Sequence, residues 1–309
     1  MRGRLPLFHP GPILILRSQV RERGASGSAL VIDCHTHLNR YTPEAPATLA
    51  ERYALLRAEM ETHGIRYALV LSSYAVTPDR PSTRDILELV GNDSRIGVVA
   101  GVRLGQDRDE ELAELRDLLE AGRIKGLKLY PGYVPFYVHD TGLRELYALA
   151  GRFRVPVMIH TGDTYAPKAR VKYAHPLTVD EAAVEFPDVT FVLCHLGNPW
   201  FADAMEVVYK NENVFADISG LTLGAFEERF ERFALGKVNE ALAYINNPSK
   251  LLFGSDWPIS DIESYLHFAR QLDATPEERE GLLWRNAARV FRLELEGTPG
   301  ATRGDDRTA

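Results

Sequence analysis

Residues 31–37 read Val-Ile-Asp-Cys-His-Thr-His, a short apolar run that ends in two histidines one residue apart. The run predicts a buried strand, and on a strand alternate side chains point to the same face. We therefore expect Asp33, His35 and His37 to share a face, with both imidazoles directed at one point. Because neutral imidazole is the commonest metal ligand, the stretch predicts half of a metal site. A pair of ordinary loop histidines is the alternative that the stretch alone leaves open.

Size and charge limit the class of protein. The chain has 309 residues and a formal net charge of -7 at pH 7, so it can bury a sizeable core, and its acidic balance argues against a nucleic-acid partner. The apolar run at residues 13–16 is too short to cross a membrane, and its flanks make a poor secretory signal. A small-molecule substrate is the expected partner.

Two cysteines, Cys34 and Cys194, each lie in an apolar run directly before a histidine. Although they could form a disulfide, buried free thiols in a reducing cytoplasm fit the pattern better. Their side chains are expected to point away from the face that carries His35 and His195.

The domain organisation follows from composition. Residues 1–28 mix proline, glycine and arginine and are expected to form a flexible extension. Residues 29–295 are expected to form one domain, and residues 296–309 a disordered tail.

Between these ends, short apolar runs alternate with segments of helical period. Strands are expected at residues 30–34, 66–72, 96–103, 126–130, 155–160, 189–194, 214–218 and 251–254. Helices are expected at residues 47–63, 82–92, 110–121, 142–153, 177–186, 201–210, 225–244 and 262–270, with two short ones at 276–283 and 286–291. Eight evenly spaced pairs predict an α/β fold of one domain, the (β/α)8 TIM barrel. The alternative, a doubly wound open sheet, would favour a glycine-rich loop where this chain has His35-Thr36-His37.

Polar residues stand where the predicted strands end, the place where barrel enzymes carry their catalytic groups. They are His35, His37, Arg103, Lys128, His160, Asp163, His195, Asp217 and Asp256. The remaining histidines, which are His9, His63, His139, His175 and His267, are expected to be surface or structural residues. Buried polar groups cost free energy unless they are paired, so four histidines and an aspartate at one rim indicate a bound cation.

These motifs resemble the amidohydrolase superfamily, and most closely its amidohydrolase-2 branch, which contains metal-dependent hydrolases and decarboxylases of the aminocarboxymuconate-semialdehyde type. The matching pieces are residues 33–37 (DCHTH), 126–131 (GLKLYP), 159–160 (IH), 194–197 (CHLG), 254–258 (GSDWP) and 286–291 (NAARVF). The resemblance covers residues 30–292 and implies a metal-dependent enzyme on a TIM barrel.

The resemblance also implies a ligand set, in which His35, His37, His160 and Asp256 hold a divalent metal. Three imidazoles, one carboxylate and one open position suit a catalytic zinc ion. Manganese or iron could occupy the same nitrogen and oxygen ligands.

Two catalytic roles stay open at this stage. His195 is a general acid or base in relatives with one metal and a ligand in those with two. Lys128 is either carboxylated, bridging two metals, or a plain ammonium that binds an anion. We favour one metal, because the branch usually works that way. Asp163 and Asp217 are either partners that orient the histidines or caps of loops.

The expected function is hydrolysis of an amide, ester or lactone bond in a small anionic substrate. Asp256 would take a proton from the attacking water and His195 would protonate the leaving side. Lys128 or Arg103 would hold the anionic part. The alternative is non-oxidative decarboxylation or hydration of an aromatic or unsaturated acid at the same metal, with Lys168 and Arg170 as further cations. A barrel that binds metal without turnover is a third, disfavoured possibility.

Three further segments have two readings each. The aromatic residues 130–137 predict either a wall over the site or a rigid turn. Trp200 either lines the site or starts a core-facing helix, and Trp257 is expected to close the pocket. The amphipathic run 226–233 predicts a surface helix, with a homo-oligomer interface as the alternative.

Overall fold

The computed structural model describes residues 30–105 and 107–295, and the predicted extension and tail lie outside these residues. Eight parallel strands form one sheet whose order in space is their order in the chain. The strands are β1 Val31–Thr36, β2 Ile65–Leu71, β3 Ile96–Gly101, β4 Gly126–Leu129, β5 Val157–Ile159, β6 Phe191–Leu193, β7 Val214–Asp217 and β8 Leu251–Leu252.

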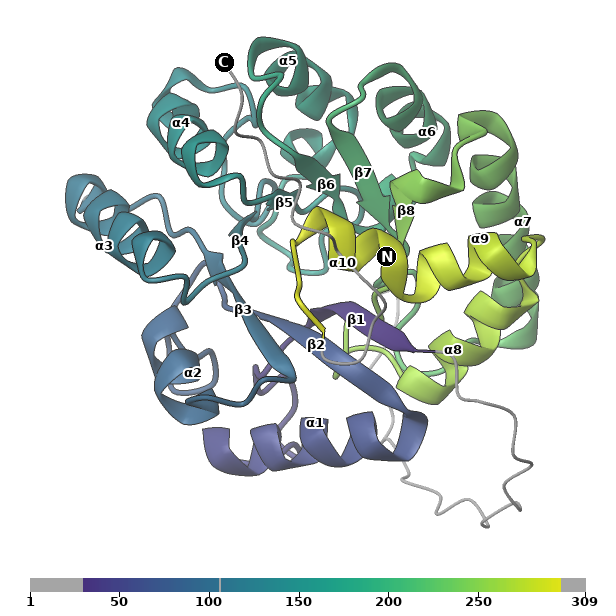
Figure 1. Cartoon of the computed structure of the whole chain (residues 1–309), viewed down its shortest axis with the longest axis horizontal. Coiled ribbons are helices and arrows are strands. Elements are labelled where there is room, and N and C mark those ends of the chain that lie inside the picture. The colour runs from purple at the N-terminus through teal and green to yellow at the C-terminus, as the bar shows by residue number, and fades with distance from the viewer. Residues whose placement is uncertain (1–29, 106, 296–309) are drawn as a thin grey trace, which may run out of the picture.

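Helices follow the strands and lie outside the ring that the strands form (Figure 1). They are α1 Leu49–His63, α2 Thr83–Val90, α3 Arg108–Glu120, α4 Arg144–Phe153, α5 Leu177–Glu185, α6 Phe201–Lys210, α7 Glu228–Ile245, α8 Ile262–Gln271, α9 Pro276–Glu280 and α10 Asn286–Val290. Short 3-10 turns occupy Thr141–Leu143, Val171–Ala174, Cys194–Gly197 and Pro248–Lys250, and a π-helical turn at Gly281–Arg285 joins α9 to α10. The predicted single-domain TIM barrel is confirmed.

The ring closes between β8 and β1. Asp256 N–H donates to the carbonyl of His35 at 2.8 Å, and His37 N–H donates to the carbonyl of Trp257 at 2.7 Å. Because β8 itself is only two residues long, these bonds from the segment after it complete the sheet. The same bonds hold the end of β1, which carries His35 and His37, next to the segment after β8, which carries Asp256.

Local sequence explains the helix boundaries. Thr48 and Glu51 form a reciprocal capping box at the start of α1, which satisfies two of the free N–H groups there. Gly64 follows α1 with φ +72°, the left-handed conformation that glycine adopts at low cost. Ser82 and Asp85 form the same box at α2.

Two apolar cores result from the alternation along each strand. Residues such as Ile32, Leu69 and Met158 fill the interior of the barrel, whereas Val70 and Val98 pack outward against the helices. Helix α10 lies across the amino-terminal end of the barrel (Figure 1), and its Val290 belongs to the interior core. That end is therefore covered, and the strand-end residues gather at the opposite, carboxyl-terminal end.

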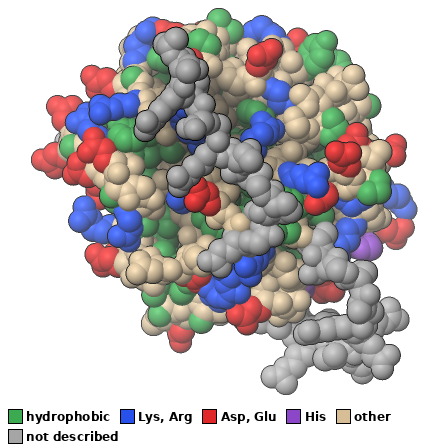
Figure 2. Space-filling model, viewed as in Figure 1, with side chains coloured by type: hydrophobic (Ala, Val, Ile, Leu, Met, Phe, Trp, Pro, Cys, Tyr) green, Lys and Arg blue, Asp and Glu red, His purple; other side chains and the backbone are tan. Residues whose placement is uncertain are grey.

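Side chains of both charge signs are interspersed over the face that carries α10 (Figure 2). Among the described residues, no helix combines the length and the apolar character needed to cross a membrane.

Candidate metal centre

The first strand does not follow strict alternation. Its pairing with β2 shifts in register between Val31 and Ile32 and again between Asp33 and Thr36. Asp33 therefore turns to the β8 side, where its carboxylate accepts hydrogen bonds from the N–H and the hydroxyl of Ser255 at 3.0 and 2.6 Å. The sequence predicts that Asp33 shares a face with His35 and His37, but its carboxylate instead ties β1 to the segment that carries Asp256.

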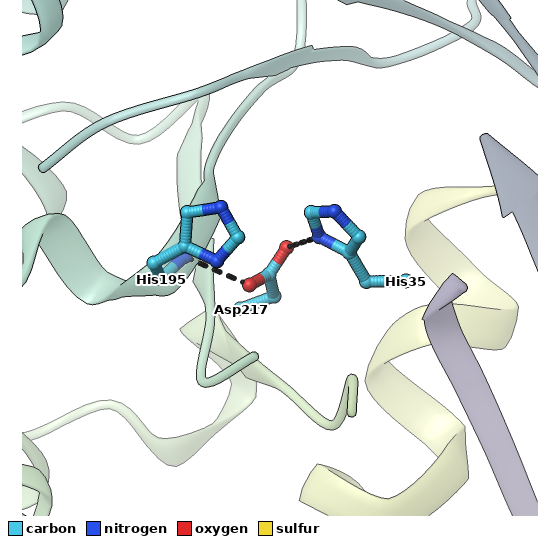
Figure 3. Close-up of side chains that lie close together, drawn as sticks. All are labelled: His35, His195 and Asp217. Carbon is cyan, nitrogen blue, oxygen red and sulfur yellow. Dashed lines mark hydrogen bonds and ion pairs between the residues drawn. The ribbon is translucent and has the colours of Figure 1, made fainter. Parts of the chain in front are cut away.

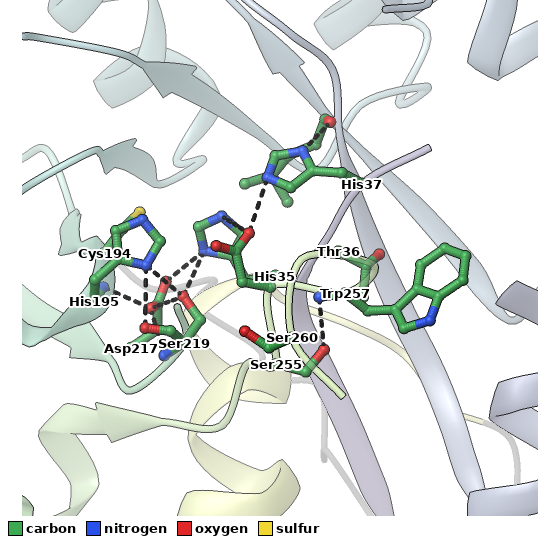
Figure 4. Close-up of polar contacts among 12 residues, drawn as sticks. His35, Thr36, His37, Cys194, His195, Asp217, Ser219, Ser255, Trp257 and Ser260 are labelled. Carbon is green, nitrogen blue, oxygen red and sulfur yellow. Dashed lines mark hydrogen bonds and ion pairs between the residues drawn. The ribbon is translucent and has the colours of Figure 1, made fainter. Parts of the chain in front are cut away.

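His35 near the end of β1 and His37 just after it lie close together in the site (Figure 4), and both contact Asp256, which follows β8. His37 Nε2 lies 3.2 Å and His35 Nε2 3.6 Å from Asp256 Oδ1. Their ligand atoms form a group whose members lie within 4.8 Å of one another. Asp256 has φ +69°, a costly conformation for a residue other than glycine, and such strain is typical of functional sites.

Hydrogen bonds fix which ring nitrogen carries the proton. His37 Nδ1 lies 2.9 Å from the carbonyl oxygen of Leu71, and His35 Nδ1 lies 3.0 Å from Asp217 Oδ2. Both partners can only accept a hydrogen bond, so each Nδ1 is the donor. Burial, followed by the charge of Lys128, lowers the pKa of His35 to about 4. The neutral ring then directs the lone pair of Nε2 at Asp256.

Asp256 Oδ1 is a buried acceptor that makes no hydrogen bond with the described part of the chain. Burial acts to raise the pKa of Asp256, but the charge of the neighbouring histidines when they are protonated, His35 first, outweighs it and holds the pKa below its usual value. When the rings are neutral, Asp256 Oδ1 instead faces two imidazole lone pairs in a site where every member is at most 7% exposed. Such an arrangement needs a positive charge between the acceptors, so these residues fit a divalent metal.

Asp217 at the end of β7 links two of the histidines (Figure 3). Its Oδ2 accepts from His35 Nδ1 and its Oδ1 accepts from the backbone N–H of His195 at 2.9 Å. His35, His195 and Asp217 also lie close enough to hold an ion, but they meet through Nδ1 atoms that already donate protons. We therefore assign Asp217 to orienting His35, as carboxylates commonly do beside metal ligands.

Ser219 completes this support, and the sequence did not draw attention to it. Its hydroxyl donates to Asp217 Oδ1 and lies 3.0 Å from Nδ1 of both His35 and His195. Asp217 and Ser219 are two residues apart at a strand end, and residues at that spacing point to the same face. This spacing could have identified Ser219 from the sequence as a neighbour of Asp217.

His195 takes its position from an unusual turn. Its φ is +64° and that of Leu196 is +45°, and its Nδ1 lies 3.1 Å from the carbonyl of Ser219. A Cβ atom at Gly220 would lie 2.5 Å from His195 Nδ1 and 2.8 Å from Asp256 Oδ2. Only glycine fits there, a second requirement that the sequence did not reveal.

His160 stands apart from the group of His35, His37 and Asp256. Its ring centroid lies 5.1 Å from that of His195 and 4.8 Å from that of Tyr133. Its Nε2 lies 3.0 Å from the backbone carbonyl of Asp163, so Nδ1 is the nitrogen with a free lone pair. Burial lowers the pKa of His160 well below its usual value, and the ring is neutral.

The predicted orientation of the cysteines is wrong. Cys34 and Cys194 are free and buried, but both belong to the interior core of the barrel. Nζ of the buried Lys128 lies 2.6 Å from Cys194 Sγ. The irregular register of β1 and the left-handed turn at His195 let a cysteine and the following histidine both face the barrel axis.

Other predicted cations lie outside the centre. Arg103 turns outward to α3, where its Nε is 3.2 Å from Glu111 Oε1, so its predicted role in substrate binding is unsupported. Lys168 and Arg170 are exposed in the loop after β5. Asp163 is exposed and meets His160 through its backbone carbonyl rather than through its carboxylate.

Of the aromatic residues singled out in the sequence, some lie beside the site and one lies outside it. Tyr133, from the segment after β4, stacks on Tyr74 at 5.5 Å between ring centroids in addition to contacting His160. Trp257 is buried in the core beside Asp256. Trp200 packs on His175 at 4.8 Å, away from the His35–His37–Asp256 group.

A ring of eight strand–helix units with a His–His–Asp centre at its carboxyl-terminal end defines a metal-binding barrel. The Amidohydrolase family model (Amidohydro_2) matches residues 32–293, and the chain belongs to that family of enzymes. No curated protein matches the chain.

Solved structures share the fold at low identity. An uncharacterized TIM-barrel protein from Bordetella bronchiseptica is 22% identical with a TM-score of 0.68, over 85% of this chain and 99% of that one. A proposed 2-pyrone-4,6-dicarboxylic acid hydrolase from Pseudomonas putida is 20% identical with a TM-score of 0.62, over 87% and 100%. A dihydroxybenzoic acid decarboxylase from Polaromonas sp. JS666, with bound manganese and the inhibitor 2-nitroresorcinol, is 15% identical with a TM-score of 0.59, over 86% and 97%.

Proposed function

We propose that the protein is a metal-dependent hydrolase that cleaves an amide, ester or lactone bond in a small anionic substrate. The observation that carries this proposal is the ionised, hydrogen-bond-free Asp256 Oδ1 facing Nε2 of His35 and His37. These three residues would hold the metal, with His160 Nδ1 as the predicted fourth ligand. Zinc is the favoured metal, because it prefers nitrogen and carboxylate ligands in this number, and manganese is the next candidate.

A divalent metal in such a site lowers the pKa of water toward roughly 7, so that hydroxide is available at neutral pH. Asp256 is the base next to that position. Its second oxygen, Oδ2, lies beside Gly220, where an added Cβ atom would be 2.8 Å away. The low pKa of Asp256 keeps it ionised and ready to accept a proton.

His195 is suited to protonating the leaving group. Its ring centroid lies 5.0 Å from that of His35 and 5.1 Å from that of His160. Because its Nδ1 is held by Ser219, Nε2 is the nitrogen left to exchange a proton with a substrate. Burial lowers the pKa of His195, so the ring is neutral at rest and must receive the proton before it donates it.

Lys128 supports the proposal of an anionic substrate. It is 1% exposed and its Nζ contacts the neutral thiol of Cys194 and lies 5.2 Å from the ring centroid of Tyr130. Within the described residues it has no ion pair with a carboxylate. An unpaired ammonium below the histidines gives the site a positive potential that attracts carboxylates.

Decarboxylation or hydration of an aromatic or unsaturated acid is the second candidate. Lys128 favours it as much as hydrolysis, and the similar structures include both a hydrolase and a decarboxylase. The free thiols of Cys34 and Cys194 support a reducing compartment such as the cytoplasm for either reaction.

One experiment tests the proposal. The purified protein is analysed for divalent metal and assayed on lactones, esters and amides that carry a carboxylate, with carbon dioxide release followed in parallel on aromatic carboxylates. We expect hydrolysis that disappears in His37→Ala and Asp256→Ala and persists in His175→Ala, a matched histidine change outside the centre. Carbon dioxide release without hydrolysis would replace the first candidate with the second, and full turnover in Asp256→Ala would end both.

A further inference from the structure

A second site lies at the other end of the barrel, where the strands begin. It is a cavity of about 680 Å³ whose lining includes Arg152, Arg154, Arg289 and Arg292, together with Asp188 and Phe215. Its elements are the end of α4, the starts of β6 and β7, and α10, which covers the amino-terminal end (Figure 1). The volume is that of a small-molecule site.

The four arginines of this cavity have no carboxylate partner in the part of the chain that the structure describes. Some arginines elsewhere on the surface, such as Arg84 and Arg285, form ion pairs with Glu114 and Glu280, whereas others do not. Among the described residues, none of the cavity arginines lies within ion-pair distance of an acidic group, Asp188 included. Lys and Arg side chains are visible near the middle of this face in Figure 2. All four arginines are exposed, so water and salt screen much of their mutual repulsion, and it is their convergence on one cavity that favours a bound anion.

Two of these arginines occupy backbone positions that favour glycine. Arg154 follows α4 with φ +53°, and Arg292 follows α10 with φ +52°. Where a helix ends in this left-handed conformation, the residue is usually glycine, because a Cβ atom is strained there. Arginine thus stands at two positions whose backbone conformation glycine adopts at lower cost, and both residues line the same cavity.

Arg289 is held in place before any ligand binds. Its Nη2 donates to the carbonyl of Ser249 at 2.8 Å, and its guanidinium lies 5.2 Å from the ring centroid of Phe215. A fixed guanidinium loses little freedom when it binds, and its remaining N–H groups are free to bind phosphate oxygens in pairs.

We propose that this cavity binds a small organic phosphate with more than one anionic group. Arginine suits phosphate because its planar fork matches two phosphate oxygens at once, and a cavity of this size takes a phosphorylated sugar rather than a single ion. The site is independent of the metal centre, which lies at the carboxyl-terminal end of the same barrel.

The test is calorimetric titration of the full chain with fructose 1,6-bisphosphate, inorganic phosphate and succinate. The variants are Arg154→Gly and Arg292→Gly, in which glycine relieves the strained backbone while it removes the charge. The matched control is Asn246→Gly, which has φ +48° after α7 and lies outside the cavity.

We expect saturable binding of the bisphosphate that weakens about tenfold or more in each arginine variant and is unchanged in the control. Unfolding temperatures of the two variants should equal or exceed that of the wild type, which separates lost binding from lost folding. Absence of saturable binding, or binding that survives both arginine changes, would overturn the proposal. Succinate binding as tight as that of the bisphosphate would overturn the choice of phosphate.

Discussion

His37 Nε2 and Asp256 Oδ1 lie 3.2 Å apart at the junction of the first and last strands, and each is an acceptor. His37 Nδ1 donates its proton to the carbonyl of Leu71, which leaves Nε2 as the acceptor of the neutral ring, and the Asp256 oxygen has no donor in the described part of the chain. Both stand in a buried site, where repulsion between acceptors is only weakly screened. A cation between them removes this cost.

Asp256→Asn should therefore separate metal binding from folding. The amide keeps the shape of the side chain, and asparagine tolerates the left-handed backbone at this position. We expect metal affinity to fall by at least about 100-fold and turnover to be lost. Without metal, the variant should unfold at the same temperature as the metal-free wild type or above it, because an amide N–H can donate to His37 Nε2. Competition with a chelator and thermal unfolding measure the two effects.

Asp217→Asn tests the partner that orients His35. The change weakens the acceptor of the Nδ1 proton, which Asp217 Oδ2 receives at 3.0 Å. Metal affinity should fall by about 10- to 100-fold, as for other residues that hold a metal ligand. Asp163→Asn is the control, since that carboxylate is exposed. Equal losses in both variants would show that Asp217 has no special role.

Gly220→Ala should damage the centre through a steric clash. The new Cβ would lie 2.5 Å from His195 Nδ1, so the histidine or the backbone must move. Gly224→Ala is a close control, because Gly224 has a similar φ of +67° and nothing within 4 Å of the added atom. We expect the Gly220 variant to lose about 1–3 kcal/mol more in free energy of unfolding than the control, measured in urea.

His63 provides a pH-dependent contribution to stability away from the metal. Its Nε2 lies 3.2 Å from Glu59 Oε2 at the end of α1. The hydrogen bond with Glu59 is the main cause that raises the pKa of His63. A raised pKa in the folded state stabilises the protein below the unfolded value of about 6.5, and this effect is lost as pH rises through the folded pKa.

The difference in free energy of unfolding between wild type and His63→Gln should therefore be larger at pH 5.5 than at pH 8.5. Because the pair is only partly buried, we expect a change of about 0.3–0.5 kcal/mol. A difference that grows toward high pH would contradict the assignment of this ion pair.

The barrel could be predicted because its signals are local. Each strand is a short apolar run, and the turns after α1 and α2 carry caps that are visible in the sequence. His35, His37 and Asp256 could be placed together because the carboxyl ends of parallel strands meet at one end of the ring.

The details that could not be predicted depend on irregular backbone. The register shift in β1 turns Asp33 away from the histidines, and positive φ angles at His195 and Asp256 aim those side chains. The space that excludes a Cβ at Gly220 exists only once β6, β7 and β8 are assembled. Alternation along one strand contains none of this information.

The most direct test of the metal centre is anomalous diffraction from crystals of the metal-loaded protein, recorded at the absorption edge of the metal. We predict one peak bonded to Nε2 of His35, Nε2 of His37 and Oδ1 of Asp256, at about 2.0–2.2 Å from each. No peak at that position, or a peak on the Nδ1 side of His35 beside Asp217, would contradict the assignment.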